Sequence, residues 1–211
     1  KSTNQSIQLT FKQAVKHHTE NNLKEAKKLY EKVIEFDPNH ADAHNNLGII
    51  FSILGDLEKA KNCYEETLKI NPKNFNAYNN MGNIFKELGD IKNAIFNYEK
   101  AIEFNPKHLN AYNNLGLIFY DLGEYIKSID NFKEAVKIDQ KNIASINGLS
   151  SSLELFEPNK KLEDYNINFK NIFLFLLKNN NIDHSIFSNK IIRFFFLDNE
   201  ELKILINSET P

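Results

Sequence analysis

Apolar residues recur along residues 41–142 in a pattern that returns every 34 residues. With Ala41 as position 1, the segments 41–74, 75–108 and 109–142 align without gaps. Positions 4, 7, 8 and 11 of each segment fall at the i, i+3, i+4, i+7 spacing of one helix face, which predicts a helix there. The shared residues are Ala43, Ala77 and Ala111 at position 3; Leu47, Met81 and Leu115 at 7; Gly48, Gly82 and Gly116 at 8; Phe51, Phe85 and Phe119 at 11; Gly55, Gly89 and Gly123 at 15; Ala60, Ala94 and Ser128 at 20; Tyr64, Tyr98 and Phe132 at 24.

Two glycines and a proline predict a second helix in each segment. We expect the glycine at position 8 to let that helix approach closely, and the glycine at position 15 to end the first helix in the left-handed conformation. An acidic residue follows the second glycine each time and favours the N-terminus of the next helix. The proline at position 32, Pro72 or Pro106, stops the second helix, although the last segment has Gln140 there.

Residues 7–40 carry a weaker copy of the same pattern, in which Asn21 replaces the turn glycine and tolerates the same backbone geometry. Over residues 7–142 the chain thus resembles the tetratricopeptide repeat family. The resemblance implies an all-α fold, a right-handed α-solenoid of helix hairpins with a concave inner surface. The matching residues of the first copy are Ala14, Leu23, Ala26, Tyr30, Val33 and Pro38.

The pattern fails after residue 142, so we expect a different organisation at the C-terminal end. Residues 143–157 look like the first helix of a fifth repeat that Pro158 ends, and the apolar residues beyond them predict further helices that form a C-terminal cap. The expected division is an N-terminal tail at 1–6, four repeats at 7–40, 41–74, 75–108 and 109–142, a partial fifth repeat or capping helix at 143–157, and a C-terminal helical segment at 158–211 that could begin a further domain.

Pairs of adjacent asparagines occupy positions 5 and 6 of three repeats, although asparagine is costly within a helix. Position 6 points away from the packed face, and position 5 lies on its flank. In the family, this side of the first helix lines the concave groove. The residues are Asn45, Asn79 and Asn113 at position 5 and Asn46, Asn80 and Asn114 at position 6.

A carboxamide both donates and accepts hydrogen bonds, so a row of them can bind the N–H and C=O groups of an extended chain. Tetratricopeptide arrays of sugar-transferase type use such an asparagine ladder, and these repeats resemble them at this position. The alternative is compositional, because the chain is rich in asparagine and repeats of common origin inherit their asparagines together. The predicted peptide-binding groove also includes Ile49, Ile53, Asn83, Lys86, Leu117 and Tyr120.

The sequence favours an interaction module that binds a protein or peptide partner. A lysine or arginine clamp for a C-terminal carboxylate is not supported, because Lys12 is the only basic residue at the corresponding groove positions. The net charge of −2 does not indicate a basic surface for binding nucleic acid. The longest apolar runs are too short to cross a membrane, for which about 20 residues are needed. A single cysteine fits a reducing compartment, and we expect a cytoplasmic protein.

No catalytic constellation, cofactor motif or metal site is predicted in this segment. His40 and His44 are four residues apart, but His40 precedes the helix and no acidic ligand is in register with them. Cys63 has no activating histidine near it in the sequence, and the glycines belong to turns and close helix contacts.

Two alternative functions remain open. The chain starts without methionine, and its residues 152–184 are weakly similar to the segment that joins repeats to a methyltransferase in bacterial multidomain proteins. It would then be the substrate-recruiting part of a larger transferase. An incomplete terminal repeat would also expose an apolar face that a second copy could cover, giving a homo-oligomeric scaffold.

Overall fold

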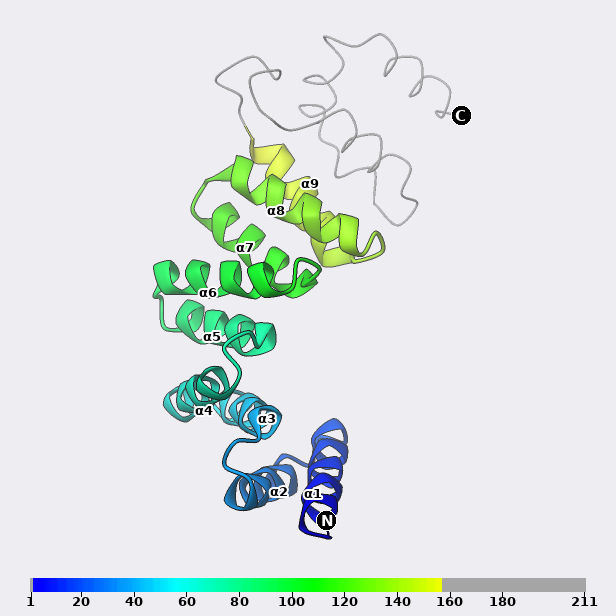
Figure 1. Ribbon diagram of the computed structural model, residues 1–211. Coiled ribbons are helices and arrows are strands. Elements are labelled where there is room, and N and C mark those ends of the chain that lie inside the picture. The colour runs from blue at the N-terminus through cyan, green and yellow to red at the C-terminus, as the bar shows by residue number, and fades with distance from the viewer. Residues whose placement is uncertain (1, 157–211) are drawn as a thin grey trace, which may run out of the picture. The chain divides into compact units, whose positions relative to one another are not determined.

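A computed structural model describes residues 2–156 of the chain, and the side chains of residues 5–156. All regular structure in this range is α-helical, as in a helical repeat solenoid, and the expected all-α repeat fold is confirmed (Figure 1). The predicted C-terminal helical segment at 158–211 lies outside the described residues. The helices are α1 (Ser2–Thr19), α2 (Leu23–Phe36), α3 (Ala41–Ile53), α4 (Leu57–Ile70), α5 (Phe75–Glu87), α6 (Ile91–Phe104), α7 (Leu109–Asp121), α8 (Tyr125–Ile138) and α9 (Ile143–Leu155).

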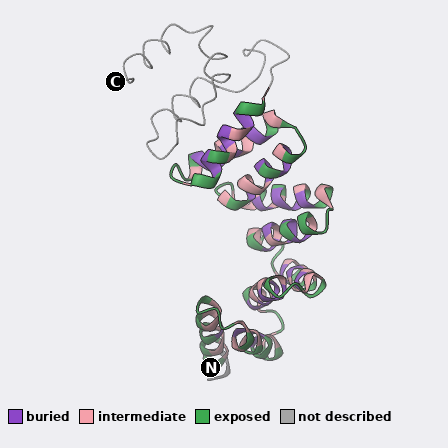
Figure 2. Ribbon diagram, turned by 180° about the vertical axis from the view of Figure 1, so that it is seen from behind, coloured by how far each residue is buried: buried purple, intermediate pink, exposed green. Residues whose placement is uncertain are grey.

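The chain divides into two compact units, Lys1–Ala111 and Tyr112–Pro211. In the first unit α1 packs on α2, α3 on α4 and α5 on α6, and these hairpins stack through the α2–α3 and α4–α5 contacts. In the second unit α8 packs on α9, and the Ser128 hydroxyl of α8 donates to the Gly116 carbonyl of α7 at 2.7 Å. Buried residues lie on the helix sides that face neighbouring helices (Figure 2).

The turn within each hairpin has the left-handed residue that the sequence predicts. Gly55, Gly89 and Gly123 have φ angles of +77°, +77° and +74°, and Asn21 takes the same conformation with φ 59°. After the first two of these glycines, the side chains of Asp56 and Asp90 accept hydrogen bonds from backbone N–H groups of the helix that follows. These contacts satisfy helix N-terminal donors, so the turn and the next helix start are specified together.

The links between hairpins survive the loss of proline at position 32. Asn71, Asn105 and Asp139 each follow the last helical residue and accept, through Oδ1, the backbone N–H two residues later at 2.9–3.2 Å. The third of these turns contains Gln140, the residue that replaces the proline, so the Asx turn forms without a proline.

The glycine at position 8 allows the two helices of a hairpin to touch. A Cβ on Gly48 would lie 2.6 Å from Cε1 of Tyr64, and a Cβ on Gly82 would lie 2.6 Å from Cε1 of Tyr98. Both tyrosine rings are fully buried. The glycine and the tyrosine at position 24 are therefore one packing unit, as the repeat pattern predicts.

The N-terminal residues differ from the expectation of a tail, because α1 begins at Ser2. Nothing in residues 2–6 breaks a helix, and the Thr10 hydroxyl donates to the Ser6 carbonyl one turn back at 2.9 Å. The first helix of the first hairpin therefore extends one turn and more beyond the repeat boundary.

Candidate functional site

The paired asparagines of α3 and α5 form a chain of side-chain hydrogen bonds within the first unit. Asn79 Nδ2 donates to Asn80 Oδ1 at 3.5 Å, and Asn80 Nδ2 donates to Asn45 Oδ1 at 3.3 Å. Asn45 Nδ2 then donates to Asn46 Oδ1 at 3.3 Å, and Asn46 Nδ2 donates to the hydroxyl of Tyr30 at 3.3 Å. We call these five residues the asparagine relay. It links α3 and α5, the first helices of two hairpins, to the core of the hairpin before them.

Burial separates the position-5 asparagines from those at position 6. Asn45 and Asn79 are each 7% exposed, whereas Asn46 and Asn80 are half-buried. In the relay, Asn46 and Asn80 each use one of two N–H groups and one of two lone pairs on the side-chain oxygen. The position-6 carboxamides thus lie at the surface and retain the capacity to bind a further donor and acceptor.

The relay ends at Tyr30, which lies next to His18, and neither residue was predicted from the sequence to belong to the groove. The Tyr30 hydroxyl lies 3.4 Å from Nδ1 of His18, and the two rings meet edge to face. Burial raises the pKa of Tyr30, against a smaller opposing effect of its hydrogen bond with Asn46, and burial lowers the pKa of His18. In the tautomer whose Nδ1 carries no proton, His18 accepts a hydrogen bond from the Tyr30 hydroxyl. The repeat position of Tyr30 predicts a buried ring, and a buried tyrosine hydroxyl needs a hydrogen-bond partner, so the sequence could have indicated that Tyr30 bonds a nearby polar side chain.

The other predicted groove residues of the first unit include both apolar and polar side chains. Ile49 is half-buried and Ile53 is 57% exposed, whereas Asn83 and Lys86 are exposed. Asn83 Oδ1 accepts the hydroxyl of Tyr98 at 2.7 Å. Tyr30 and Tyr98, at position 24 of two hairpins, thus each form a hydrogen bond with an asparagine of α3 or α5.

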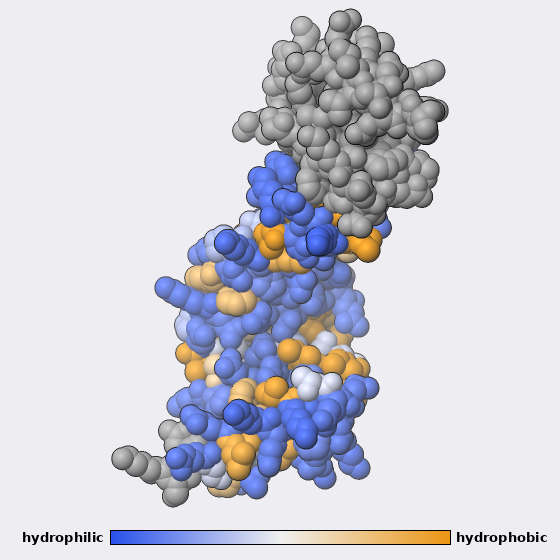
Figure 3. Space-filling model, turned by 90° about the vertical axis from the view of Figure 1, so that its right-hand side faces the viewer, coloured by the Kyte–Doolittle hydropathy of each residue, from blue (hydrophilic) through white to orange (hydrophobic). Residues whose placement is uncertain are grey.

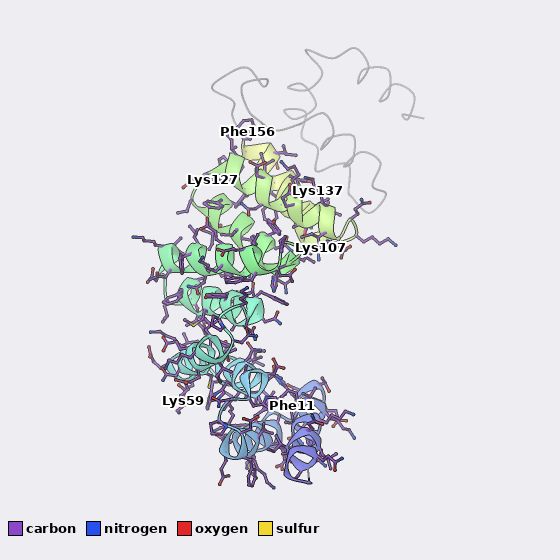
Figure 4. All side chains as sticks on the ribbon, in the orientation of Figure 1. Phe11, Lys59, Lys107, Lys127, Lys137 and Phe156 are labelled. Carbon is purple, nitrogen blue, oxygen red and sulfur yellow. The ribbon has the colours of Figure 1, made fainter. Side chains whose placement is uncertain are left out.

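In the first repeat, position 5 is occupied by Phe11, where the later repeats have asparagine. The Phe11 ring on α1, labelled in Figure 4, lies against the His40 ring just before α3, with ring centroids 4.5 Å apart and the ring planes tilted by 36°. On the face seen in Figure 3, hydrophobic residues form separate patches within a mostly hydrophilic surface.

The remaining predicted groove residues belong to the second unit and make a different set of contacts. Asn113 is half-buried and its Oδ1 accepts the Ser145 hydroxyl of α9 at 2.7 Å. Asn114 and Tyr120 are also half-buried, and Leu117 is 44% exposed. The structure therefore brings four of the six paired asparagines into one network and bonds a fifth to a serine.

Histidines cap helices in this fold. His40 Nδ1 accepts the backbone N–H of Ala43, and His108 Nδ1 accepts that of Ala111, both at 3.2 Å. His44 Nε2 lies 3.0 Å from the Pro38 carbonyl, so its nearest hydrogen-bond partner is a backbone oxygen. Among residues 5–156, no group of three or more histidine, cysteine, aspartate or glutamate side chains is placed to hold a metal ion.

Cys63 is half-buried, and burial raises the pKa of its thiol to about 11. The thiol is therefore protonated at neutral pH, which disfavours nucleophilic chemistry there. Within the part of the chain that the structure describes, no helix is long and apolar enough to cross a membrane.

Three family models match the chain, and all three describe tetratricopeptide repeats. One, described as "TPR repeat", matches residues 17–55 and 82–123; two described as "Tetratricopeptide repeat" match residues 41–74 and 109–142, and residues 63–96. Together they cover residues 17–142 without a gap, which is more than half of the 211 residues. No curated protein sequence matches the chain.

Solved structures share the fold at low sequence identity. A structure described as "Crystal structure of MamA protein" aligns with a TM-score of 0.63 and 18% identity over 99% of this chain and 98% of that one. A second, "Functional Characterization of Pseudomonas Aeruginosa pilF", aligns with a TM-score of 0.70 and 15% identity over 99% of this chain and 100% of that one. At these identities the likeness establishes the fold alone.

Proposed function

Because the chain belongs to the tetratricopeptide repeat family, we propose that it is a protein-interaction scaffold that binds an extended segment of a partner protein. The contact surface of the first unit consists of the inner helices α3 and α5. Its principal contacts are the carboxamides of Asn46 and Asn80, with Asn83 and Lys86 beside them. The proposal is a non-catalytic role for this segment.

The observation that carries the proposal is the equivalence of Asn46 and Asn80. Both occupy position 6 of an inner helix, both are half-buried, and both have one donor and one acceptor engaged in the relay. Because each carboxamide retains a second donor and acceptor, two consecutive repeats present the same capacity for hydrogen bonds. This repetition supports the proposal of an asparagine ladder, which would bind the main chain of a peptide with little dependence on its sequence.

Energetics require further contacts besides the carboxamides. A net hydrogen bond contributes about 0.5–1.5 kcal/mol, whereas association costs on the order of 4–15 kcal/mol. The side chains of Ile49 and Ile53 supply apolar surface beside Asn46 on the same helix. In the second unit, Asn113, Asn114, Leu117 and Tyr120 are candidates for additional contacts. We therefore expect weak to moderate affinity.

Two other roles are compatible with the same groove. The chain would be the substrate-recruiting part of a transferase, for example a methyltransferase, if a catalytic domain accompanies it. It would be a self-assembling scaffold if a second copy supplies the bound segment. Because both alternatives use the same groove, the proposal is tested with a peptide of defined sequence.

The test uses peptides selected from a phage library of random dodecamers and resynthesised for isothermal titration. The double substitution Asn46→Ala and Asn80→Ala should weaken binding about 5- to 100-fold, since it removes contacts that together contribute about 1–3 kcal/mol. The control is Asn62→Ala, the same substitution at an exposed position of α4. Equal affinities of the double variant and the wild type would refute the proposal, and so would the absence of any selected binder.

A further inference from the structure

All the carboxamide hydrogen bonds of the relay have the same direction. Each amide N–H donates to the next member of the relay, in the order Asn79, Asn80, Asn45, Asn46 and the Tyr30 hydroxyl. Two of these bonds cross between hairpins, since Asn80 bonds Asn45 across 35 residues of sequence and Asn46 bonds Tyr30 across 16. The relay is thus a property of the stacked hairpins.

A carboxamide has distinct ends, so a bond at one end determines what the other end presents. Asn80 donates to Asn45 and accepts from Asn79, and Asn46 donates to Tyr30 and accepts from Asn45. Rotation of either amide by 180° would place two N–H groups, or two oxygens, against each other. The orientations of Asn46 and Asn80 are therefore coupled through Asn45, which is buried between them.

The last acceptor of the relay is the Tyr30 hydroxyl, which also lies beside His18. The Tyr30 oxygen accepts a hydrogen bond from Asn46 Nδ2 at 3.3 Å and lies 3.4 Å from His18 Nδ1. Burial lowers the pKa of His18, which favours the neutral ring, and in the tautomer whose Nδ1 carries no proton this atom accepts the Tyr30 hydroxyl hydrogen bond. This arrangement favours the orientation in which Asn46 donates to Tyr30.

We propose that Asn45 and Tyr30 are positioning residues of the binding groove, which hold the carboxamides of Asn46 and Asn80 in one shared orientation for the partner's main chain. This inference rests on the proposed function. Neither positioning residue touches the partner: Asn45 is 7% exposed, and the Tyr30 ring is fully buried in the core. Preorganised polar groups bind more tightly because less side-chain freedom is lost on association. The paired asparagines thus have separate roles, one orienting and one binding.

The first part of the test needs no partner. In the ¹⁵N spectrum of the whole chain, Tyr30→Phe should change the side-chain amide signals of Asn46, Asn45 and Asn80 and speed the exchange of their two amide protons. The matched control is Tyr64→Phe, which alters the equivalent core tyrosine of the next hairpin. A change confined to Asn46, or no change beyond that of the control, would overturn the proposal.

The second part of the test measures affinity for a peptide selected from the dodecamer library. Tyr30→Phe should weaken binding about 2- to 10-fold, the effect of one hydrogen bond, with the control variant within twofold of the wild type. A second variant, Asn45→Ala, breaks the relay at its centre and should weaken binding at least as much. Unchanged affinity in both variants would refute the positioning role even where Asn46→Ala and Asn80→Ala confirm peptide binding. If no peptide binds the wild type, the proposed function fails, and the amide signals still decide whether the relay orders Asn46 and Asn80.

Discussion

Replacing Asn45 by alanine tests the relay through the stability of the fold. Asn45 donates to Asn46 and accepts from Asn80, so its loss removes two hydrogen bonds in a buried position. At about 0.5–1.5 kcal/mol for each bond, the loss is about 1–3 kcal/mol. Alanine has the higher helix propensity, which offsets up to about 0.7 kcal/mol. We expect a net destabilisation of about 0.3–2.3 kcal/mol.

The matched control for this experiment is again Asn62→Ala on α4. Its side chain is exposed, so the substitution should gain helix propensity and stabilise the chain by a few tenths of a kcal/mol. Urea unfolding followed by circular dichroism measures both variants, and at an m-value of about 2 kcal/mol/M their midpoints should differ by about 0.5–1.5 M. If Asn45→Ala were as stable as Asn62→Ala, the relay would contribute nothing, and the reasoning that explains the paired asparagines would be wrong.

Four further predictions concern packing, backbone conformation, protonation and reactivity. Gly82→Ala should destabilise the fold by up to about 2 kcal/mol in thermal unfolding, since overpacking against Tyr98 costs about 1–3 kcal/mol and helix propensity returns about 1 kcal/mol; Gly89→Ala should cost about 1–2 kcal/mol through its positive φ alone. Burial lowers the pKa of His108 in the folded chain, so its contribution to stability is complete above the unfolded value of 6.5 and is lost as the pH falls below it. His108→Asn should keep the helix cap and reduce this acid sensitivity in urea unfolding between pH 7 and 5, whereas an unchanged pH profile would show that His108 is not responsible. The Cys63 thiol, with a pKa of about 11, should react with a thiol reagent at pH 8 far more slowly in the folded chain than in urea, and equal rates would contradict its burial.

The repeat pattern predicted the fold because each of its positions has a local physical cause. Gly55 follows a helix and has the left-handed conformation that its position requires, and Asn21 adopts it where the first repeat lacks glycine. Gly48 lies against Tyr64 because no side chain larger than hydrogen fits there. Such features depend on neighbours within one hairpin, so sequence spacing was sufficient to find them.

The contacts of the asparagines could not be predicted in the same way. Helical spacing indicates which side of α3 carries Asn45 and Asn46, but it does not say which groups of another hairpin meet them. The bonds to Tyr30 and Asn80 depend on how the hairpins stack. The sequence alone therefore assigned both positions to the groove, whereas in the first unit the structure buries Asn45 and Asn79 and leaves Asn46 and Asn80 half-buried.

One expectation at the N-terminal end differed from the structure. Residues 2–6 were expected to form a tail because the repeat pattern starts at residue 7, but a helix continues until something breaks it. His18, on the same helix, is half-buried and lies at hydrogen-bond distance from Tyr30. In a terminal repeat the pattern is weak, and its polar residues are the hardest to place from spacing alone.

The claim that the asparagines bind a partner's main chain is tested most directly by methylating the backbone of a bound peptide. Each peptide nitrogen of a library-selected dodecamer is methylated in turn, and isothermal titration measures its affinity for the wild type and for the chain with both Asn46→Ala and Asn80→Ala. The account predicts that methylation at one or two positions weakens binding to the wild type at least threefold and has no effect on binding to the double variant. An equal loss for both proteins at every position would contradict it.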